Sequence, residues 1–285
     1  MKNQKVLVIG AGLAGSDAAW FLAGKGVPVV LVEGKSKTPN PSQKLKSFGE
    51  LVCTNSLKSM DPSSGHGLLK YEMNAMGSLV LEAAYQNQVP AGDALAVDRE
   101  KFSLAITEKL ENHALIEVVK EVVGDPLDWG LKYDCSYIIV ATGPLTSEAL
   151  EEWMQKTLGK EDLYFYDAIA PVVDADSLNY EKLYYKDRHK PVPEEEGIEA
   201  DYLNAPFTKD EYVDFISELV AAEKVESKDF EEYKFFESCL PIDIMAERGE
   251  ETARFSCMKP IGLELPDGKR PYACVQLRKE NLLGS

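Results

Sequence analysis

Residues 6 to 33, VLVIGAGLAGSDAAWFLAGKGVPVVLVE, constrain the fold of this chain more than any other stretch. A short apolar run is followed by three glycines in G-x-G-x-x-G spacing, a helical stretch and a second apolar run that ends in an acid. In a strand-helix-strand unit the first glycine permits a tight turn, the second lets backbone amides approach a pyrophosphate, and the third lets helix and strand pack closely. The pyrophosphate then lies at the helix N-terminus, where free N–H groups favour an anion.

The glycine spacing alone is weak evidence, because a glycine-rich turn can simply serve the core. Here strand, glycines, helix, strand and acid occur in the required order, which favours a dinucleotide site. Glu33 stands where an acid accepts hydrogen bonds from an adenosine ribose, so FAD or NAD fits better than NADP. The predicted cofactor contacts are Gly10, Ala11, Gly12, Leu13, Ala14, Gly15, Glu33, Thr142 and Gly143.

The chain has 285 residues, 45% of them hydrophobic, which suffices for a core and favours two domains. No run approaches the length of a membrane span, and the N-terminal run is unlike a secretory signal. We therefore expect a cytoplasmic protein without a membrane partner. Five cysteines without a CxxC pair indicate reduced thiols, and the three scattered histidines form no metal motif.

The net charge of −17 is unevenly distributed. Counting Lys and Arg against Asp and Glu, residues 1–145 hold 14 and 16, whereas residues 146–285 hold 17 and 32. Residues 34–49 nevertheless contain four lysines and no acid; these are Lys35, Lys37, Lys44 and Lys46. This positive patch is either a solvated loop or a binding surface, and the patch alone favours the solvated loop.

The pattern of elements predicts an α/β fold with a Rossmann-like FAD- or NAD(P)-binding domain over residues 1–145 and a second α+β insertion domain over residues 146–285. Residues 34–62 are rich in Pro, Ser and Lys and predict a long loop, which in a compact domain is usually functional or disordered. Cys53 lies within this loop.

Periodicity predicts the remaining elements of the first domain. One apolar stripe predicts a single helix that carries Leu69, Met73, Met76, Val80 and Ala83. A second helix, capped by Asp98, carries Phe102, Ile106 and Leu110. Strands are expected at residues 115–119 and 137–141, the second of which runs into the turn Ala141-Thr142-Gly143.

In the second half, Ser147 is expected to begin a helix that carries Leu150, Trp153, Met154 and Leu158 and ends at Gly159. Residues 186–206 are charged and contain prolines, which predicts a surface excursion. Thr208 and Glu211 form a capping box for a further helix with Tyr212, Phe215, Ile216, Leu219 and Val220 on one face. Strands are expected at residues 163–166, 254–258 and 272–277.

Pro241 suits the first position of a helix, which would place Cys239 just ahead of a helix N-terminus. A thiolate is stabilised there and its pKa is lowered. The alternative is a buried cysteine that acts as a small hydrophobic residue, which is the usual case for a single Cys.

Ten segments along the whole chain resemble the TrmFO family of folate- and FAD-dependent RNA uracil-C5 methyltransferases, which form ribothymidine in the tRNA T-loop. The segments are IGAGLAGSDAAW, ELVCTNSLKS, GLLKYEM, VPAGDALAVDR, VATGPLTS, LYFYDAIAPVVDADS, EADYLNAPFTKDEY, FFESCLPIDIMAERG, MKPIGL and KRPYACVQLRKEN. The GidA-type tRNA-modifying flavoproteins share the first segment.

The resemblance implies that 5,10-methylenetetrahydrofolate supplies the carbon, that reduced FAD carries and reduces it, and that NAD(P)H recharges the flavin. It also implies that Cys53 and Cys239 are the catalytic pair, nucleophile and base or second thiol, without deciding which is which. Cys135, Cys257 and Cys274 lie in strand-like contexts and are expected to be structural. The expected partners are tRNA and the folate, and the oligomeric state is left open.

Members of the family are longer, and their C-terminal part returns to the FAD domain, so the resemblance implies a nucleotide domain that is incomplete at its C-terminus. Three functions therefore stand: the methyltransferase, with tRNA or ribosomal RNA as substrate; a truncated flavoprotein that does no chemistry; and an FAD or NAD oxidoreductase with thiol chemistry. The third is least favoured, because the two cysteines form no CxxC pair. We expect the chain as given to hold FAD weakly or not at all.

Overall fold

The computed structural model describes residues 4–38, 43–143, 146–158, 171–188, 200–223 and 240–281. The chain divides into two units, each described by itself. The first contains Met1–Gln88 and Ala94–Ile169, and the second contains Val89–Asp93 and Ala170–Ser285. Among the described residues, none of the helices combines the length and the apolar composition that a membrane span requires.

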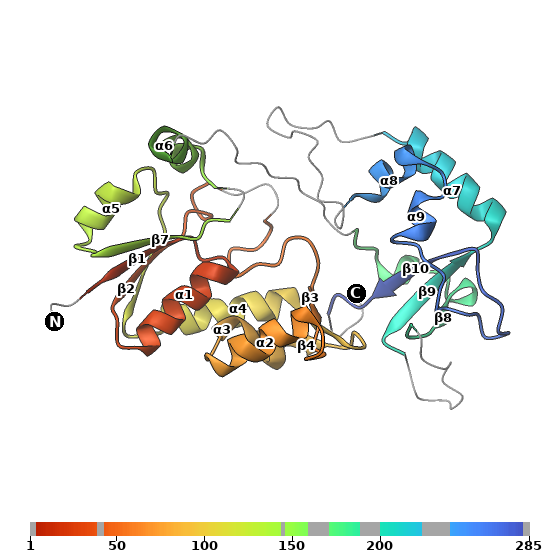
Figure 1. Ribbon diagram of the computed structural model, residues 1–285, viewed down its shortest axis with the longest axis horizontal. Helices are drawn as coiled ribbons and strands as arrows, with labels where there is room; N and C mark the ends of the chain where they lie inside the picture. The colour runs from red at the N-terminus through yellow and green to blue at the C-terminus, as the bar shows by residue number, and fades with distance from the viewer. Residues whose placement is uncertain are drawn as a thin grey trace. The chain divides into compact units, whose positions relative to one another are not determined.

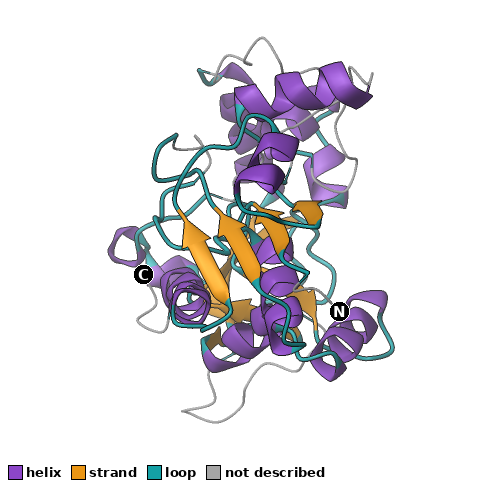
Figure 2. Cartoon of the chain, turned by 90° about the vertical axis from the view of Figure 1, so that its left-hand side faces the viewer, coloured by secondary structure: helices purple, strands orange, loops and turns teal. Residues whose placement is uncertain are grey.

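A parallel sheet with the strand order β6-β2-β1-β7 organises the first unit. The strands are short and apolar, and in Figure 2 their arrows run in the same direction. Alternate residues of β1 face opposite sides of the sheet, so both faces must be covered. The strands are β1 (Val6–Ile9), β2 (Val29–Val32), β6 (Ile116–Val119) and β7 (Tyr137–Val140).

Helices cover both faces of this sheet (Figure 1). Val6 and Val8 pack into one apolar cluster with α1 (Leu13–Gly24), α3 (Leu79–Gln86) and α4 (Arg99–Glu111). Leu7 and Ile9 pack into another cluster with α5 (Pro126–Lys132) and α6 (Glu148–Leu158). The expected α/β fold is confirmed, and its sheet is parallel. The predicted cap Asp98 accepts a hydrogen bond from the Lys101 amide, as expected for the start of α4.

The expected boundary at residue 145 differs from the observed division in two places. Helix α6, expected to open the second domain, packs through Leu150 into the core of the first unit. Residues Val89–Asp93 belong to the second unit, because the Gly92 amide donates to Asp201 Oδ2 at 2.5 Å and the Tyr202 hydroxyl donates to the Ala91 carbonyl.

The prediction of a single helix from one apolar stripe is wrong, because the structure has two helices in this segment. Helix α2 (Gly65–Ala75) ends before Gly77, whose φ of 79° turns the chain, and Ser78 caps α3 by accepting a hydrogen bond from the Leu81 amide. Leu69 and Met76 are consequently exposed rather than part of a continuous core stripe.

A second sheet, in the order β3-β5-β4, corrects the expectation of an unstructured loop over residues 34–62. Its first strand lies inside that segment and pairs antiparallel with β5. The strand reads Ser-Leu-Lys-Ser, and its single apolar residue gives no periodicity from which to predict it. The strands are β3 (Ser56–Ser59), β4 (Gln88–Val89) and β5 (Ala94–Val97).

In the second unit, three strands form an antiparallel sheet in the order β10-β9-β8. One apolar cluster joins Ala273 of this sheet to Tyr212 and Ile216 of α7 and to α8 and α9. The predicted capping box of Thr208 and Glu211 is present, whereas Val220 is exposed rather than in the core. The elements are β8 (Tyr184–Tyr185), β9 (Tyr202–Phe207), α7 (Lys209–Ala221), α8 (Ile242–Arg248), α9 (Thr252–Phe255) and β10 (Ala273–Arg278). Two 3₁₀ turns, Ala175–Ser177 and Tyr180–Lys182, precede β8.

Several expectations for the second half need correction. Residues 254–258 form no strand, because Thr252–Phe255 is helical, and the expected surface excursion ends in strand β9. Pro241 is the N-cap of α8 with an extended ψ of 150°, not its first helical residue. The strand expected at residues 272–277 is confirmed as β10. The strand expected at residues 163–166 and the helix stop at Gly159 lie outside the described residues.

Candidate functional site

The three glycines of the first turn have different surroundings. A Cβ on Gly10, whose φ is +98°, would lie 2.6 Å from the Ala141 carbonyl oxygen, and a Cβ on Gly15 would lie 1.8 Å from the Gly10 carbonyl oxygen. These two positions therefore exclude a side chain for packing reasons. A Cβ on Gly12 would meet nothing within 4 Å. The space beside Gly12 is the open side of the turn, where a ligand could approach the backbone.

The start of α1 is suited to an anion. Gly12 is its N-cap and makes no side-chain capping hydrogen bond, and the first turn contains no acid. The free amides at such a helix start carry a partial positive charge that a phosphate satisfies. The predicted contact Thr142 lies beside the turn, because its Cα would be 2.8 Å from a Cβ on Gly10. Gly143 follows it, exposed, with a φ of +71°. The residues present therefore fit the pyrophosphate part of a dinucleotide.

Glu33 holds the turn itself. Its Oε2 accepts a hydrogen bond from the Ala11 amide at 2.8 Å, and its Oε1 accepts one from the Lys35 amide at 2.9 Å. The carboxylate thus ties the end of β2 to the glycine turn. A ribose hydroxyl would add to these bonds or replace one of them. The predicted role of Glu33 as a ribose acceptor stays a prediction.

Cys53 is exposed and lies between two anchored residues. On one side Leu51 is buried and its carbonyl oxygen accepts from Arg99 Nη1 at 3.3 Å. On the other side Asn55 is buried and its carbonyl oxygen accepts from the Val97 amide at 2.9 Å. Only residues 52–54 span the interval, so the thiol is presented to solvent from a short, fixed segment.

The lysine-rich segment is not a uniform positive patch. The side chain of Lys35 is only 6% exposed and its Nζ contacts Glu50 Oε2 at 3.4 Å, so its charge is compensated. Lys37 pairs with Glu121 at 3.5 Å on the surface. Lys44, Lys46 and Lys58 are exposed. The expectation of a positive patch made by all four lysines is therefore corrected for Lys35, whose charge is compensated, whereas Lys44 and Lys46 are exposed.

The segment just before Cys53 contains contacts that sequence reasoning missed. The Gly49 amide donates to the Ala11 carbonyl oxygen at 2.8 Å, and the Ser103 hydroxyl donates to the Phe48 carbonyl oxygen at 2.5 Å. Gly49 has a φ of +63°, and a Cβ there would lie 2.6 Å from Ile106 Cδ1. The Phe-Gly-Glu sequence next to the cysteine was the available signal, since a glycine in such a turn often meets a close contact.

The other cysteines differ in their surroundings. Cys239 lies outside the described residues, so its predicted role stays a prediction. Cys274 is buried in β10, and burial raises the pKa of its thiol. Desolvation also raises the pKa of Cys135 and of Cys257. Cys257 is not in a strand as expected, since it follows α9, and its Sγ lies 3.8 Å from Met245 Sδ.

Comparison with known proteins places the chain in a family. A family model described as "Glucose inhibited division protein A" matches residues 5–285. The "Methylenetetrahydrofolate--tRNA-(uracil-5-)-methyltransferase TrmFO" of Ligilactobacillus salivarius is 48% identical over 283 residues, which cover 99% of this chain and 62% of that protein. The protein of the same name from Myxococcus xanthus is 49% identical over 286 residues, with 100% and 60% covered.

The chain thus spans about three fifths of the length of these curated relatives. A solved structure of Aquifex aeolicus GidA aligns with a TM-score of 0.35 and 20% identity over 43% of this chain and 20% of that chain. The resemblance to the TrmFO proteins that the sequence motifs indicated is confirmed, and the chain belongs to the glucose inhibited division protein A family.

Proposed function

We propose that this chain carries the nucleotide-binding and thiol-bearing part of an enzyme that methylates C5 of uridine in the tRNA T-loop, with 5,10-methylenetetrahydrofolate as carbon donor. The observation that carries the proposal is Cys53, an exposed thiol in a fixed segment. The identity of 46–49% to proteins named tRNA-(uracil-5-)-methyltransferases supports the same reaction. The activity, substrate and partners of the whole protein follow here as proposals.

The chemistry requires a nucleophile because C5 of uracil is a poor carbon nucleophile. A thiolate that adds to C6 forms a carbon–sulfur bond and moves an electron pair onto the ring as an enolate. C5 of that enolate then forms a bond to the one-carbon electrophile, whose carbon–nitrogen double bond gives an electron pair to nitrogen; the remaining carbon–nitrogen bond breaks when the carbon is reduced. A base removes the C5 proton, and elimination breaks the carbon–sulfur bond and releases the thiolate. We assign these two roles to Cys53 and Cys239 without deciding which thiol performs which.

FAD is the cofactor that the turn would hold. Gly12, Leu13 and Ala14 would offer backbone amides to its pyrophosphate, with Glu33 near the ribose. The flavin, when bound and reduced, supplies the electrons that bring the transferred carbon to the methyl level. NAD(P)H is proposed as the source of those electrons. The exposed Lys44 and Lys46 would face the phosphates of RNA or the glutamate tail of the folate.

Ribothymidine formation tests the proposal. A T-loop transcript is incubated with the purified protein, methylenetetrahydrofolate, NADH and FAD in large excess, because weak FAD binding is expected, and its nucleosides are measured by mass spectrometry. We expect ribothymidine with the unchanged protein and none with Cys53→Ala. Cys257→Ala is the matched control, because it removes another exposed thiol from outside the site.

A ribosomal RNA fragment serves as the second substrate in the same assay. If only that fragment is methylated, the proposed reaction stands and its substrate is ribosomal RNA instead of tRNA. The absence of ribothymidine in every RNA, with nucleotide still bound, would reduce the function of the chain to flavin or nucleotide binding. Unchanged activity in Cys53→Ala would remove Cys53 from the mechanism.

A further inference from the structure

Five residues close a ring of contacts between the glycine turn and the segment that leads to Cys53. Ala11 donates through its amide to Glu33 and accepts through its carbonyl from Gly49, both at 2.8 Å. Lys35 donates through its amide to Glu33 at 2.9 Å and through its Nζ to Glu50 at 3.4 Å. Gly49 and Glu50 are neighbours in the chain, which completes the ring.

The carboxylate of Glu50 accepts hydrogen bonds from several groups of the loop that precedes Cys53. Its Oε1 accepts from the amides of Lys44 and Leu45 at 2.7 and 3.0 Å, while its Oε2 contacts the Lys35 ammonium. The Lys35 Nζ also donates to the Ser47 carbonyl oxygen at 2.6 Å. One carboxylate and one ammonium therefore hold three points of the loop backbone.

The burial of this pair distinguishes it from an ordinary surface ion pair. The side chains of Lys35 and Glu50 are only 6% and 5% exposed. A buried charge is costly unless it is paired and its remaining hydrogen-bonding sites are used, as they are here. The neighbouring pair, Lys37 with Glu121, is 54% and 52% exposed and contributes little to stability.

We propose that Glu50 is a positioning residue for the reaction. Through Lys35 it fixes the loop before Cys53, and so it keeps the Cys53 segment in a constant position relative to the cofactor turn. Only Leu51 and Val52 separate Glu50 from Cys53, and Leu51 is buried. The Gly49 amide on the Ala11 carbonyl joins the same segment to the turn. The role in the reaction rests on the proposed function, whereas the anchoring of the loop does not.

Trypsin measures the anchoring directly. Cleavage after Lys44 requires the Lys44–Leu45 segment to leave its hydrogen bonds to Glu50 and enter the protease in extended form. In Glu50→Ala we expect cleavage at this bond to accelerate by about tenfold or more, because proteolysis follows the population of the opened segment. Mass spectrometry identifies the cleaved bond. Glu121→Ala, which breaks only the exposed pair, should leave the rate unchanged.

The reactivity of Cys53 gives a second readout. Iodoacetamide labelling of Cys53 is measured relative to Cys257 in the same chain, which corrects for differences in reagent and protein concentration. The ratio should change in Glu50→Ala and stay constant in Glu121→Ala. In the methylation assay, kcat measured at saturating RNA should fall in Glu50→Ala, because the loop positions the thiol; saturating RNA separates this loss from any weaker binding through the released Lys44.

Glu50→Ala leaves a buried lysine without its partner and could unfold the protein. The double variant Lys35→Met with Glu50→Leu avoids this, since an apolar pair of similar size often replaces a buried ion pair without loss of stability. It removes the acceptor for the Lys44 and Leu45 amides, so its loop should be cleaved faster although circular dichroism shows a folded protein. A folded double variant with unchanged cleavage and labelling overturns the proposal. If cleavage and labelling change in the Glu50 variants but the unchanged protein methylates no RNA, the anchoring role stands and only the proposed function is rejected.

Discussion

The amide of Gly49 lies 2.8 Å from the carbonyl oxygen of Ala11 and donates a hydrogen bond to it. The same Ala11 donates its own amide to Glu33, so both polar backbone groups of this residue are used inside the chain. The turn expected to bind pyrophosphate and the segment that carries Cys53 are consequently one hydrogen-bonded piece of structure. Substitutions in the turn can therefore be sorted into those that break the fold and those that affect only the ligand.

Gly12→Ala should leave the fold intact and weaken nucleotide binding. No atom lies within 4 Å of the position that its Cβ would take. We expect the free energy of unfolding in urea to change by less than about 0.5 kcal/mol, as for most sites without close neighbours. FAD or ADP affinity should fall by roughly tenfold or more, because the methyl group stands where the backbone approaches the pyrophosphate.

Gly15→Ala is the matched comparison from the same turn. Its Cβ would lie 1.8 Å from the Gly10 carbonyl oxygen, so α1 would have to move away from the strand. We expect a loss of stability at or above the roughly 1–3 kcal/mol typical of overpacking. Equal stability of the two variants would show that the helix packs differently, and equal nucleotide affinity of Gly12→Ala and the unchanged chain would place the ligand elsewhere.

The five thiols should differ in their rates of alkylation. Cys53 is exposed, and Cys239 is predicted to precede a helix, so both should be alkylated faster than the other three near neutral pH. Desolvation raises the pKa of Cys135, Cys257 and Cys274. A raised pKa lowers the thiolate fraction at a given pH, so labelling of these three should increase only as the pH rises above the ordinary range of a thiol.

Residue-resolved mass spectrometry after iodoacetamide treatment between pH 6 and 10 measures these rates. Labelling under denaturing conditions is the control, since all five thiols should then react alike. If Cys53 reacts no faster than buried Cys274 in the folded protein, its assignment as a reactive thiol is wrong.

Much of the first unit could be predicted because its signals are local. The glycine spacing, the apolar runs of β1 and β2 and the cap at Asp98 each follow from neighbours in the sequence, and the structure shows all of them. The single helix over residues 69–83 fails for a local reason as well. The stripe ignores Gly77 and Ser78, which end one helix and begin the next.

The site is less predictable because its contacts are distant in sequence. The sequence places Lys35 in a positive patch, since its partner Glu50 is 15 residues away and no local pattern shows which charges are buried together. The glycine at position 49 indicates a turn, but the sequence does not show that its close contact is with Ile106 of α4, far away in the chain. Strand β3 could not be predicted, because its mostly polar sequence does not alternate between apolar and polar residues.

The exposed lysines near Cys53 should contribute to RNA affinity. Lys44→Gln with Lys46→Gln should weaken binding of a T-loop transcript and reduce the slope of log K against log salt by roughly one unit for each phosphate that the protein no longer neutralises. Lys35→Gln is unsuitable for this test, because its charge is buried against Glu50. Lys37→Gln is a better control, since Glu121 already offsets that charge. An unchanged slope, measured by filter binding at several salt concentrations, would make the loop an ordinary solvated one.

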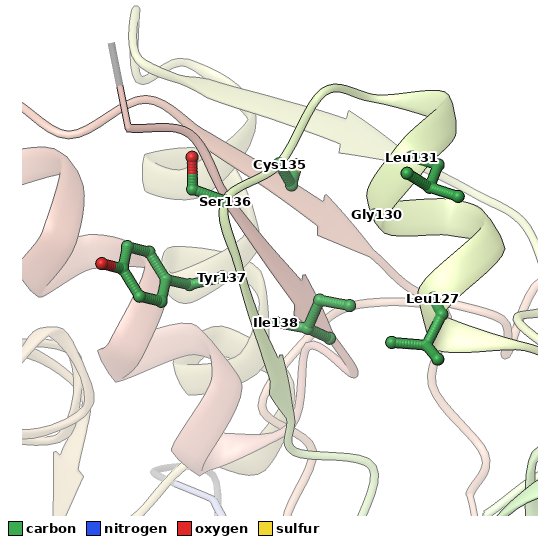
Figure 3. Close-up of a pocket in the computed structure, with 7 residues that line it drawn as sticks. All are labelled: Leu127, Gly130, Leu131, Cys135, Ser136, Tyr137 and Ile138. Atoms are coloured by element: carbon green, nitrogen blue, oxygen red, sulfur yellow. The ribbon is translucent and has the colours of Figure 1, made fainter. Parts of the chain in front are cut away.

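The open edge of the parallel sheet should make the chain associate. Among the described strands β7 pairs only with β1, and a groove of about 590 Å³ lies between it and α5 (Figure 3). Leu131 on α5 is 81% exposed and Tyr137 on β7 is 58% exposed, on opposite sides of the strand in Figure 3. An exposed apolar edge of this kind pairs readily with another chain.

Leu131→Lys with Tyr137→Lys should therefore reduce concentration-dependent association, measured by light scattering after gel filtration, without loss of helical circular dichroism. Tyr71→Lys is the control, because Tyr71 is also well exposed but lies on α2, away from the sheet edge. The absorbance spectrum of the same samples tests the expected weak flavin binding. A monomer that keeps flavin bands in stoichiometric amount would show that residues of this chain enclose the ring and that the edge of β7 needs no partner.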